Sequence, residues 1–337
     1  MTLNKISNKI IFGAITVATL LTGFVNFNAS AQTTANRGII VSPAIMELEA
    51  DRGNSYEFTV KIENDTPDTN YTMRSLVNSF EAGSEEGIPV IKELPDGSEL
   101  KNWIKFDQEE FTLASRESFD SVFKVNVPDE AKPGSYFLAV TYATGDKEKV
   151  VTNSKVVVEQ RVAALLFVTV KGKVERQVEF KTFATNKQVY DPFFDGLKLD
   201  YKIGTEGNVY LKPAGNIFVG NDINNPEATL ALNPNENFIL PNSSRTFEFV
   251  NQAKLNIPFL TQKVTGEREV EISRPWFGTQ KITANVLFAD SEGKLERKEI
   301  ETQVLFIPWK SGLLLLVTVG AAVGAYFVAK PKFSKEK

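Results

Sequence analysis

Apolar side chains recur with a period of two along most of this 337-residue chain. Residues 56–63 alternate apolar and polar, and residues 119–127, 136–142, 197–203 and 282–288 repeat the pattern. Every second side chain of a strand lies on the same face, so each segment predicts a strand with its apolar face inward and its polar face outward. Turn-forming residues separate these segments, and no amphipathic helix pattern intervenes. The sequence therefore predicts an all-β fold of two tandem β-sandwiches.

The predicted strands form two sets. The first covers residues 37–171 and ends on the long apolar segment "KVVVEQRVAALLFVTV", and the second covers residues 172–309. Within the second set, "GTEGNVYLKPAGNIFVG" is rich in glycine, but its spacing matches no phosphate-binding loop. We expect residues 212–215 to form a hairpin turn that joins two short strands.

The N-terminus has the layout of a secretory signal peptide. Lys5 and Lys9 precede an uncharged apolar run, and Ala29 and Ala31 provide a small-residue cleavage site. The alternative is an uncleaved membrane anchor. We expect residues 1–31 to be removed.

Near the C-terminus, residues 312–329 contain no charged side chain and suffice to cross a bilayer. Trp309 and Tyr326 lie near the two ends, where aromatic side chains favour the membrane interface. A lysine-rich tail, residues 330–337, begins with Lys330 and Lys332. Because lysine marks the cytoplasmic side, we expect a single-pass cell-membrane protein with an extracellular body and a cytoplasmic tail. The alternative is a buried core helix.

Gly320 and Gly324 form a GxxxG pair within this span. Such pairs allow two membrane helices to approach closely, so the pattern is compatible with helix dimerisation.

Composition narrows the chemistry. Between the two ends, residues 32–309 carry about ten more acidic than basic side chains, which argues against nucleic acid. The chain has neither histidine nor cysteine, which excludes catalytic triads that use them and the usual zinc sites. The lack of cysteine in an exported chain favours a bacterial source. We expect no enzymatic activity, no catalytic residue, no metal and no cofactor.

Carboxylate pairs are the remaining catalytic option. The clusters are Glu85 with Glu86, Glu109 with Glu110, and Asp191 with Asp195. A glycan hydrolase needs two carboxylates that face each other across a cleft. Neighbouring side chains of a strand point to opposite faces, so solvated surface acids are the simpler interpretation.

Two aromatic segments are candidates for partner binding. "VYDPFFDG" contains Tyr190, Phe193 and Phe194, and "SRPWFGTQ" contains Trp276 and Phe277. Exposed aromatic rings could contact a sugar or a protein partner. Alternatively, these rings close the end of the sandwich core.

Some segments resemble known families. The opening "IIVSPAIMELEADRGNSYEFTVKIENDTPDTNY" and the later "VPDEAKPGSY" are similar to immunoglobulin-like domains of surface and envelope proteins. The resemblance implies two tandem immunoglobulin-like β-sandwiches, followed by the single transmembrane helix. With the two ends and "IPWK", the layout resembles the WxL-interacting-protein family of Gram-positive surface proteins. That resemblance implies binding to peptidoglycan and to other surface components. A weaker likeness to periplasmic pilus chaperones implies assembly of surface fibres.

Three functions remain open. The first is a membrane-anchored protein that binds cell-wall peptidoglycan or another cell-surface protein. The second is an assembly chaperone for surface fibres that acts by strand donation. The third is a hydrolase that uses only carboxylates.

Overall fold

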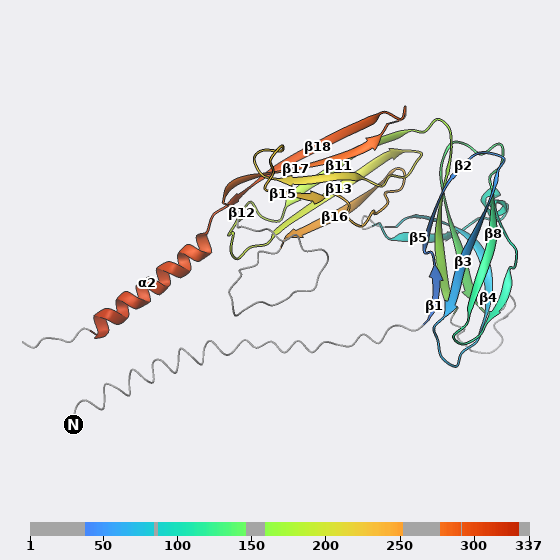
Figure 1. The fold of residues 1–337 in the computed structure, drawn as a ribbon, viewed down its shortest axis with the longest axis horizontal. Helices are drawn as coiled ribbons and strands as arrows, with labels where there is room; N and C mark the ends of the chain where they lie inside the picture. The colour runs from blue at the N-terminus through green and yellow to red at the C-terminus, as the bar shows by residue number, and fades with distance from the viewer. Residues whose placement is uncertain (1–37, 84–86, 146–158, 252–276, 291, 330–337) are drawn as a thin grey trace, which may run out of the picture. The chain divides into compact units, whose positions relative to one another are not determined.

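A computed structural model describes residues 38–83, 87–145, 159–251, 277–290 and 292–329 (Figure 1). The predicted cleavage site at Ala29 and Ala31, Trp276, and the tail lysines Lys330 and Lys332 lie outside the described residues.

Two sheets form the first β-sandwich. One has the strand order β1-β3-β8-β6, made of β1 (Ile39–Ser42), β3 (Ser55–Asn64), β8 (Ser118–Asn126) and β6 (Ile104–Phe106). The other has the order β2-β10-β9-β4-β5, made of β2 (Ile45–Ala50), β10 (Arg161–Val170), β9 (Gly134–Thr144), β4 (Tyr71–Ala82) and β5 (Pro89–Glu93). β7 (Glu110–Leu113) also pairs with β4, and a 3₁₀ helix, η1 (Glu99–Trp103), precedes β6.

Two more sheets form the second β-sandwich. β11 (Arg176–Thr185), β13 (Leu197–Gly207) and β16 (Ser243–Asn251) make a three-stranded sheet in that order. The other has the order β12-β18-β17-β14-β15, made of β12 (Val189–Tyr190), β18 (Leu295–Phe306), β17 (Gly278–Ala289), β14 (Ala214–Val219) and β15 (Ala228–Ala231).

The period of two produces the two cores. On β3, Val60 and Ile62 are buried while Lys61 and Glu63 are exposed, and Phe123 of β8 stacks on Phe58. The second core gathers the inward side chains of β13 and β17 in the same way. The predicted all-β fold with immunoglobulin-like sandwiches and a helix able to span a membrane is confirmed.

β9 departs from the predicted alternation, because both of its faces are buried. Ala139 and Thr141, on the face expected to be polar and outward, are almost fully covered. Phe167 of β10 is also buried on this side, with its ring centroid 5.1 Å from that of Tyr210 and 4.3 Å from that of Phe238. Aromatic side chains from a distant part of the sequence therefore cover this sheet, which a local pattern does not reveal.

The predicted hairpin at residues 212–215 is wrong. β14 pairs with β15 and β17, whereas Leu211 makes an isolated bridge to Ile239. Gly215 has a φ of 155°, and a Cβ there would lie 2.0 Å from the carbonyl oxygen of Asn285. This glycine therefore allows β14 to approach β17 closely rather than to turn the chain.

Helix α2 (Trp309–Ala329) follows β18 after two connecting residues, Ile307 and Pro308, and contains the predicted span (Figure 1). Its 21 residues give a length of about 31 Å, which matches the hydrocarbon thickness of a bilayer. None of the residues 309–327 is buried, so α2 is not a core helix. A Cβ at Gly320 or Gly324 would meet no neighbouring atom, and dimerisation through this face remains a prediction.

The burial of the second face of this sheet can be tested at Phe167 of β10, which packs on the side of Ala139. Phe167→Ala should lower the free energy of unfolding by about 3–5 kcal/mol, because it empties an aromatic cluster that cannot easily collapse. Chemical denaturation in detergent measures the loss. Ile91→Ala, at an exposed position of β5, should stay within about 0.5 kcal/mol of the unaltered chain. Equal effects of the two changes would contradict the burial of this face.

Candidate functional site

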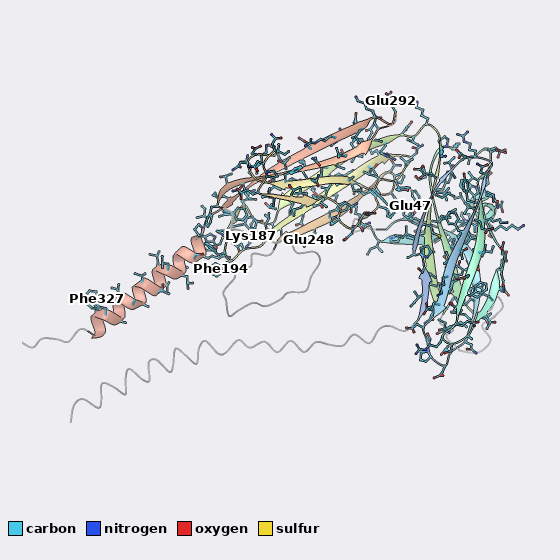
Figure 2. The ribbon with its side chains drawn as sticks, viewed as in Figure 1. Glu47, Lys187, Phe194, Glu248, Glu292 and Phe327 are labelled. Carbon is cyan, nitrogen blue, oxygen red and sulfur yellow. The ribbon has the colours of Figure 1, made fainter. Side chains whose placement is uncertain are left out.

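The loop between β12 and β13 lies beside the first turn of α2. β12 pairs in parallel with the end of β18, so Tyr190 is opposite Phe306. The N–H of Ile307 donates to the carbonyl of Tyr190 at 2.9 Å. Both strands end at the same edge of the sheet. β12 is followed by the loop 191–196, and β18 is followed by α2. Figure 2 shows Lys187 and Phe194 close to the start of the helix.

Asp191 caps α2 from 119 positions earlier in the chain. One oxygen of its fully buried carboxylate, Oδ2, accepts the backbone N–H groups of Lys310 at 2.8 Å and Ser311 at 3.2 Å. The other oxygen, Oδ1, accepts the N–H of Phe193 at 3.0 Å, which holds the carboxylate within its own loop.

This contact completes the first turn of the helix. The initial N–H groups of a helix have no partner inside it and need one elsewhere. In α2, the N–H of Trp309 donates to the carbonyl of Ile307, and that of Gly312 donates to Pro308. Asp191 accepts the two between them, and its negative charge is favourable at the positive end of the helix dipole.

Asp195 ties the loop to the helix through two ammonium groups. Its Oδ1 accepts from Lys187 Nζ at 2.8 Å and from Lys310 Nζ at 2.6 Å. Its Oδ2 accepts the backbone N–H of Asp191 at 2.8 Å. The side chain of Asp195 is 6% exposed, whereas those of Lys187 and Lys310 are 46% and 34% exposed. We call Lys187, Asp191, Asp195, Lys310 and Ser311 the capping cluster.

Both aspartates of the capping cluster are held in the ionised form. Burial raises the pKa of the Asp195 carboxyl, but the N–H of Asp191 and the two lysines outweigh it and lower the pKa well below its usual range. Burial likewise raises the pKa of Asp191, and the N–H groups of Phe193, Ser311 and Lys310 lower it overall.

Of the candidate carboxylate pairs, the structure describes Asp191 with Asp195 and Glu109 with Glu110. Asp191 and Asp195 direct their oxygens to the donors named above. Glu109 and Glu110 are exposed, and Glu85 and Glu86 lie outside the described residues.

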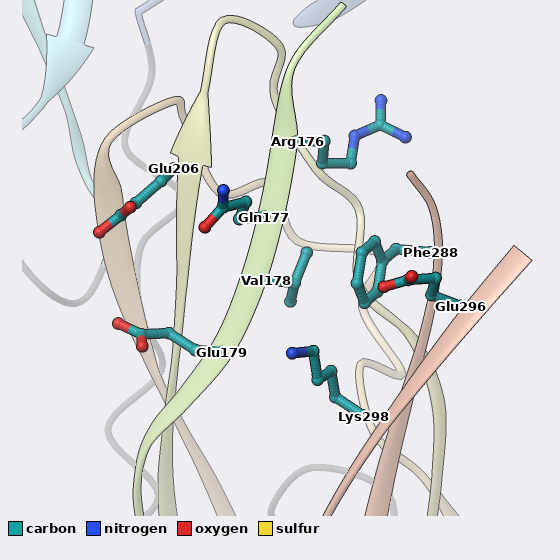
Figure 3. Close-up of a pocket in the computed structure, with 8 residues that line it drawn as sticks. All are labelled: Arg176, Gln177, Val178, Glu179, Glu206, Phe288, Glu296 and Lys298. Atoms are coloured by element: carbon teal, nitrogen blue, oxygen red, sulfur yellow. The ribbon is translucent and has the colours of Figure 1, made fainter. Parts of the chain in front are cut away.

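A hollow of about 300 Å³ is lined by residues of β11, β13, β17 and β18, five of which are charged. Figure 3 shows the carboxylates of Glu179 and Glu206 on one side of β11 and that of Glu296 on the other. They do not converge on one point as a hydrolase requires. No group of three or more acidic side chains suited to a metal ion occurs in the described ranges.

The aromatic candidates occupy different environments. Tyr190 is fully buried, where its hydroxyl donates to Asn186 Oδ1 at 2.6 Å and its ring stacks on Phe306. Phe193 is half-buried, and its ring lies edge-on to that of Phe277 with centroids 5.8 Å apart. Tyr190 therefore closes the core, whereas the structure brings Phe193 and Phe277 together at the end of the sandwich.

Phe194 and Phe277 remain exposed, at 48% and 51%. Trp309 is 52% exposed at the first residue of α2, and Tyr326 is 62% exposed near its other end. These two residues are the predicted interface anchors, and that role stays a prediction.

Sequence reasoning missed Lys187, Lys310 and Ser311. Their only local signal is that Lys310 and Ser311 directly precede the uncharged span and follow a proline, a position typical of a helix start. The sequence does not reveal their contact with Asp191, because Asp191 lies far away in the sequence, in the connection between β12 and β13.

Among solved structures, the chain is similar to several chaperones. The class 5 fimbriae chaperone CfaA is 12% identical over 80% of this chain and 100% of its own, with a TM-score of 0.36. The E. coli chaperone DraB is 13% identical over 80% and 97%, with a TM-score of 0.31. CupB2 of Pseudomonas aeruginosa is 10% identical over 77% and 98%, with a TM-score of 0.32. Similarities this low carry no argument about function.

No family model matches the sequence. No curated protein matches it either.

Asp191→Ala should loosen the start of α2. The change leaves two backbone N–H groups without an acceptor, so the free energy of unfolding should fall by about 1–3 kcal/mol. Amide hydrogen exchange at Lys310 and Ser311 should also accelerate. Asp107→Ala, at an exposed aspartate, should change stability by less than about 0.5 kcal/mol. Unchanged exchange at both amides would contradict the cap.

Because of the capping cluster, the free energy of unfolding should depend on pH in the acidic range. The folded-state pKa of Asp195 lies below its unfolded value, so its stabilisation is present above an ordinary aspartate pKa of about 4 and is lost as pH falls further. The stability advantage of the unaltered chain over Asp195→Asn should therefore be constant near neutral pH and shrink from about pH 5 towards pH 2. Thermal unfolding of both proteins measures it. An advantage that grows on acidification would exclude this assignment.

Proposed function

We propose that this chain is a non-enzymatic, membrane-anchored binding protein that holds a cell-surface partner with its β-sandwiches outside the cell. The observation that carries the proposal is the capping of α2 by Asp191. A helix suited to spanning a bilayer is joined to the second sandwich by buried, directional hydrogen bonds rather than by a free linker. Such a junction would keep the sandwich at the membrane surface.

The resemblance to WxL-interacting proteins supports two classes of partner, peptidoglycan and another surface protein. Both are consistent with a chain in which binding uses strands and loops rather than a catalytic cleft.

Strand β5 favours a protein partner. It ends its sheet, and its pairing in the described part of the chain is with β4. All five of its side chains are exposed, and Val90 and Ile91 present apolar surface there, as does the preceding Ile88. An open strand edge with apolar side chains is suited to pairing with an added strand of another chain.

The same edge also supports the second candidate, a chaperone for surface fibres. A chaperone would release its partner to a growing fibre, whereas a binding protein would retain it. Persistence of the complex on the cell surface therefore separates the two functions.

Partner binding should depend on β5. The full chain in detergent is incubated with purified peptidoglycan and, separately, with solubilised surface proteins of the producing cell. Replacing Val90 and Ile91 together by lysine should reduce retention of a surface protein at least tenfold, because charge disfavours strand addition.

Leu295→Lys is the matched control, since Leu295 is an exposed apolar residue of β18, and it should retain full binding. Retention on peptidoglycan that survives the β5 change would assign the wall as the partner. Retention on neither material would refute the proposed function.

A further inference from the structure

Four exposed apolar side chains lie at the end of the second sandwich where α2 begins. Phe194, Phe277, Ile307 and Trp309, which we call the collar, are between 43% and 52% exposed. They come from three different segments, and the strand register brings them together.

Pairing within the five-stranded sheet fixes this position. Gly278 is opposite Phe306 in the antiparallel pair of β17 and β18, so Phe277 lies at the level of Ile307. Tyr190 is opposite Phe306 in the parallel pair, so Phe193 and Phe194 follow at the same end. The contact between the rings of Phe193 and Phe277 agrees with this register.

The charges of the capping cluster, which lies beside the collar, cancel. Asp191 and Asp195 carry two negative charges, and Lys187 and Lys310 carry two positive ones. Both ammonium groups bind Asp195, and Lys310 Nζ also lies 5.3 Å from the centre of the Trp309 ring. A cluster without net charge and with its acceptors occupied is less costly to bring into a medium of low polarity than isolated ions are.

From this arrangement we infer that the collar inserts into the lipid interface of the membrane that α2 spans. The inference rests on the anchoring in the proposed function. Trp309 belongs both to the collar and to the span, so the other three side chains are held at the depth where α2 enters the bilayer. Aromatic rings favour this boundary region, where apolar atoms leave water. The sandwich is thereby seated on the membrane as well as tethered to it.

The absence of cysteine makes a direct test available, because one introduced cysteine can be labelled uniquely. Phe194→Cys and Phe277→Cys are prepared in the full chain, labelled with a small fluorophore and reconstituted into phosphatidylcholine vesicles. Quenching by lipid-attached nitroxide is compared with quenching by aqueous iodide.

Two matched positions calibrate the measurement. Leu295 lies at the opposite end of β18 from Phe306, a distance of about 36 Å along the strand, and Leu295→Cys should report water. Leu316 lies within α2, and Leu316→Cys should report hydrocarbon. We expect both collar labels to be quenched by the lipid nitroxide several-fold more than the label at Leu295.

Three outcomes would overturn the inference. Collar labels as accessible to iodide as the label at Leu295, with the label at Leu316 in lipid, would leave the anchoring intact and refute collar insertion. Collar labels protected from both quenchers would show that protein covers them. A label at Leu316 that reports water would refute the anchoring itself.

Discussion

The contact between the Asp191 carboxylate and the first turn of α2 determines how the apolar helix is joined to the second β-sandwich. Without it, two N–H groups of Lys310 and Ser311 would lack partners where the helix leaves the sandwich. Because hydrogen bonds are directional, this contact restricts the direction in which the helix leaves the sandwich. The buried carboxylate can remain ionised because backbone N–H groups and the helix dipole stabilise its charge.

The sequence predicts the strands well wherever one face is buried and the other solvated. β3 and β8 follow this pattern, so periodicity locates them. For β9 the pattern wrongly predicts a solvated outer face, because aromatic side chains distant in the sequence cover that face. Small residues such as Ala139 carry no signal of that burial. The error at residues 212–215 has a related cause. Turn chemistry is local, whereas β14 pairs with strands that lie further along the chain.

For the candidate site, the sequence identifies the unusual residues but not their relations. The loop "VYDPFFDG" and Trp309 attract attention separately, through composition and through position beside an apolar span. Their proximity depends on the short parallel pairing of β12 with β18, which involves only two residue pairs and has no periodic signature. The aspartates therefore suggest catalysis or solvation when read alone, and a helix cap once the pairing is known.

A polar cluster is a costly way to join two elements, since ions lose hydration when they are buried. At this junction, apolar packing would have to use side chains that already point outward, such as Phe194 and Trp309. The cluster instead satisfies its charges internally, through Asp195 and its two lysines. The capping cluster thus holds the start of the helix, and none of its own charges is left unpaired. Both features suit the inferred arrangement, in which the sandwich rests against a bilayer rather than standing away from it.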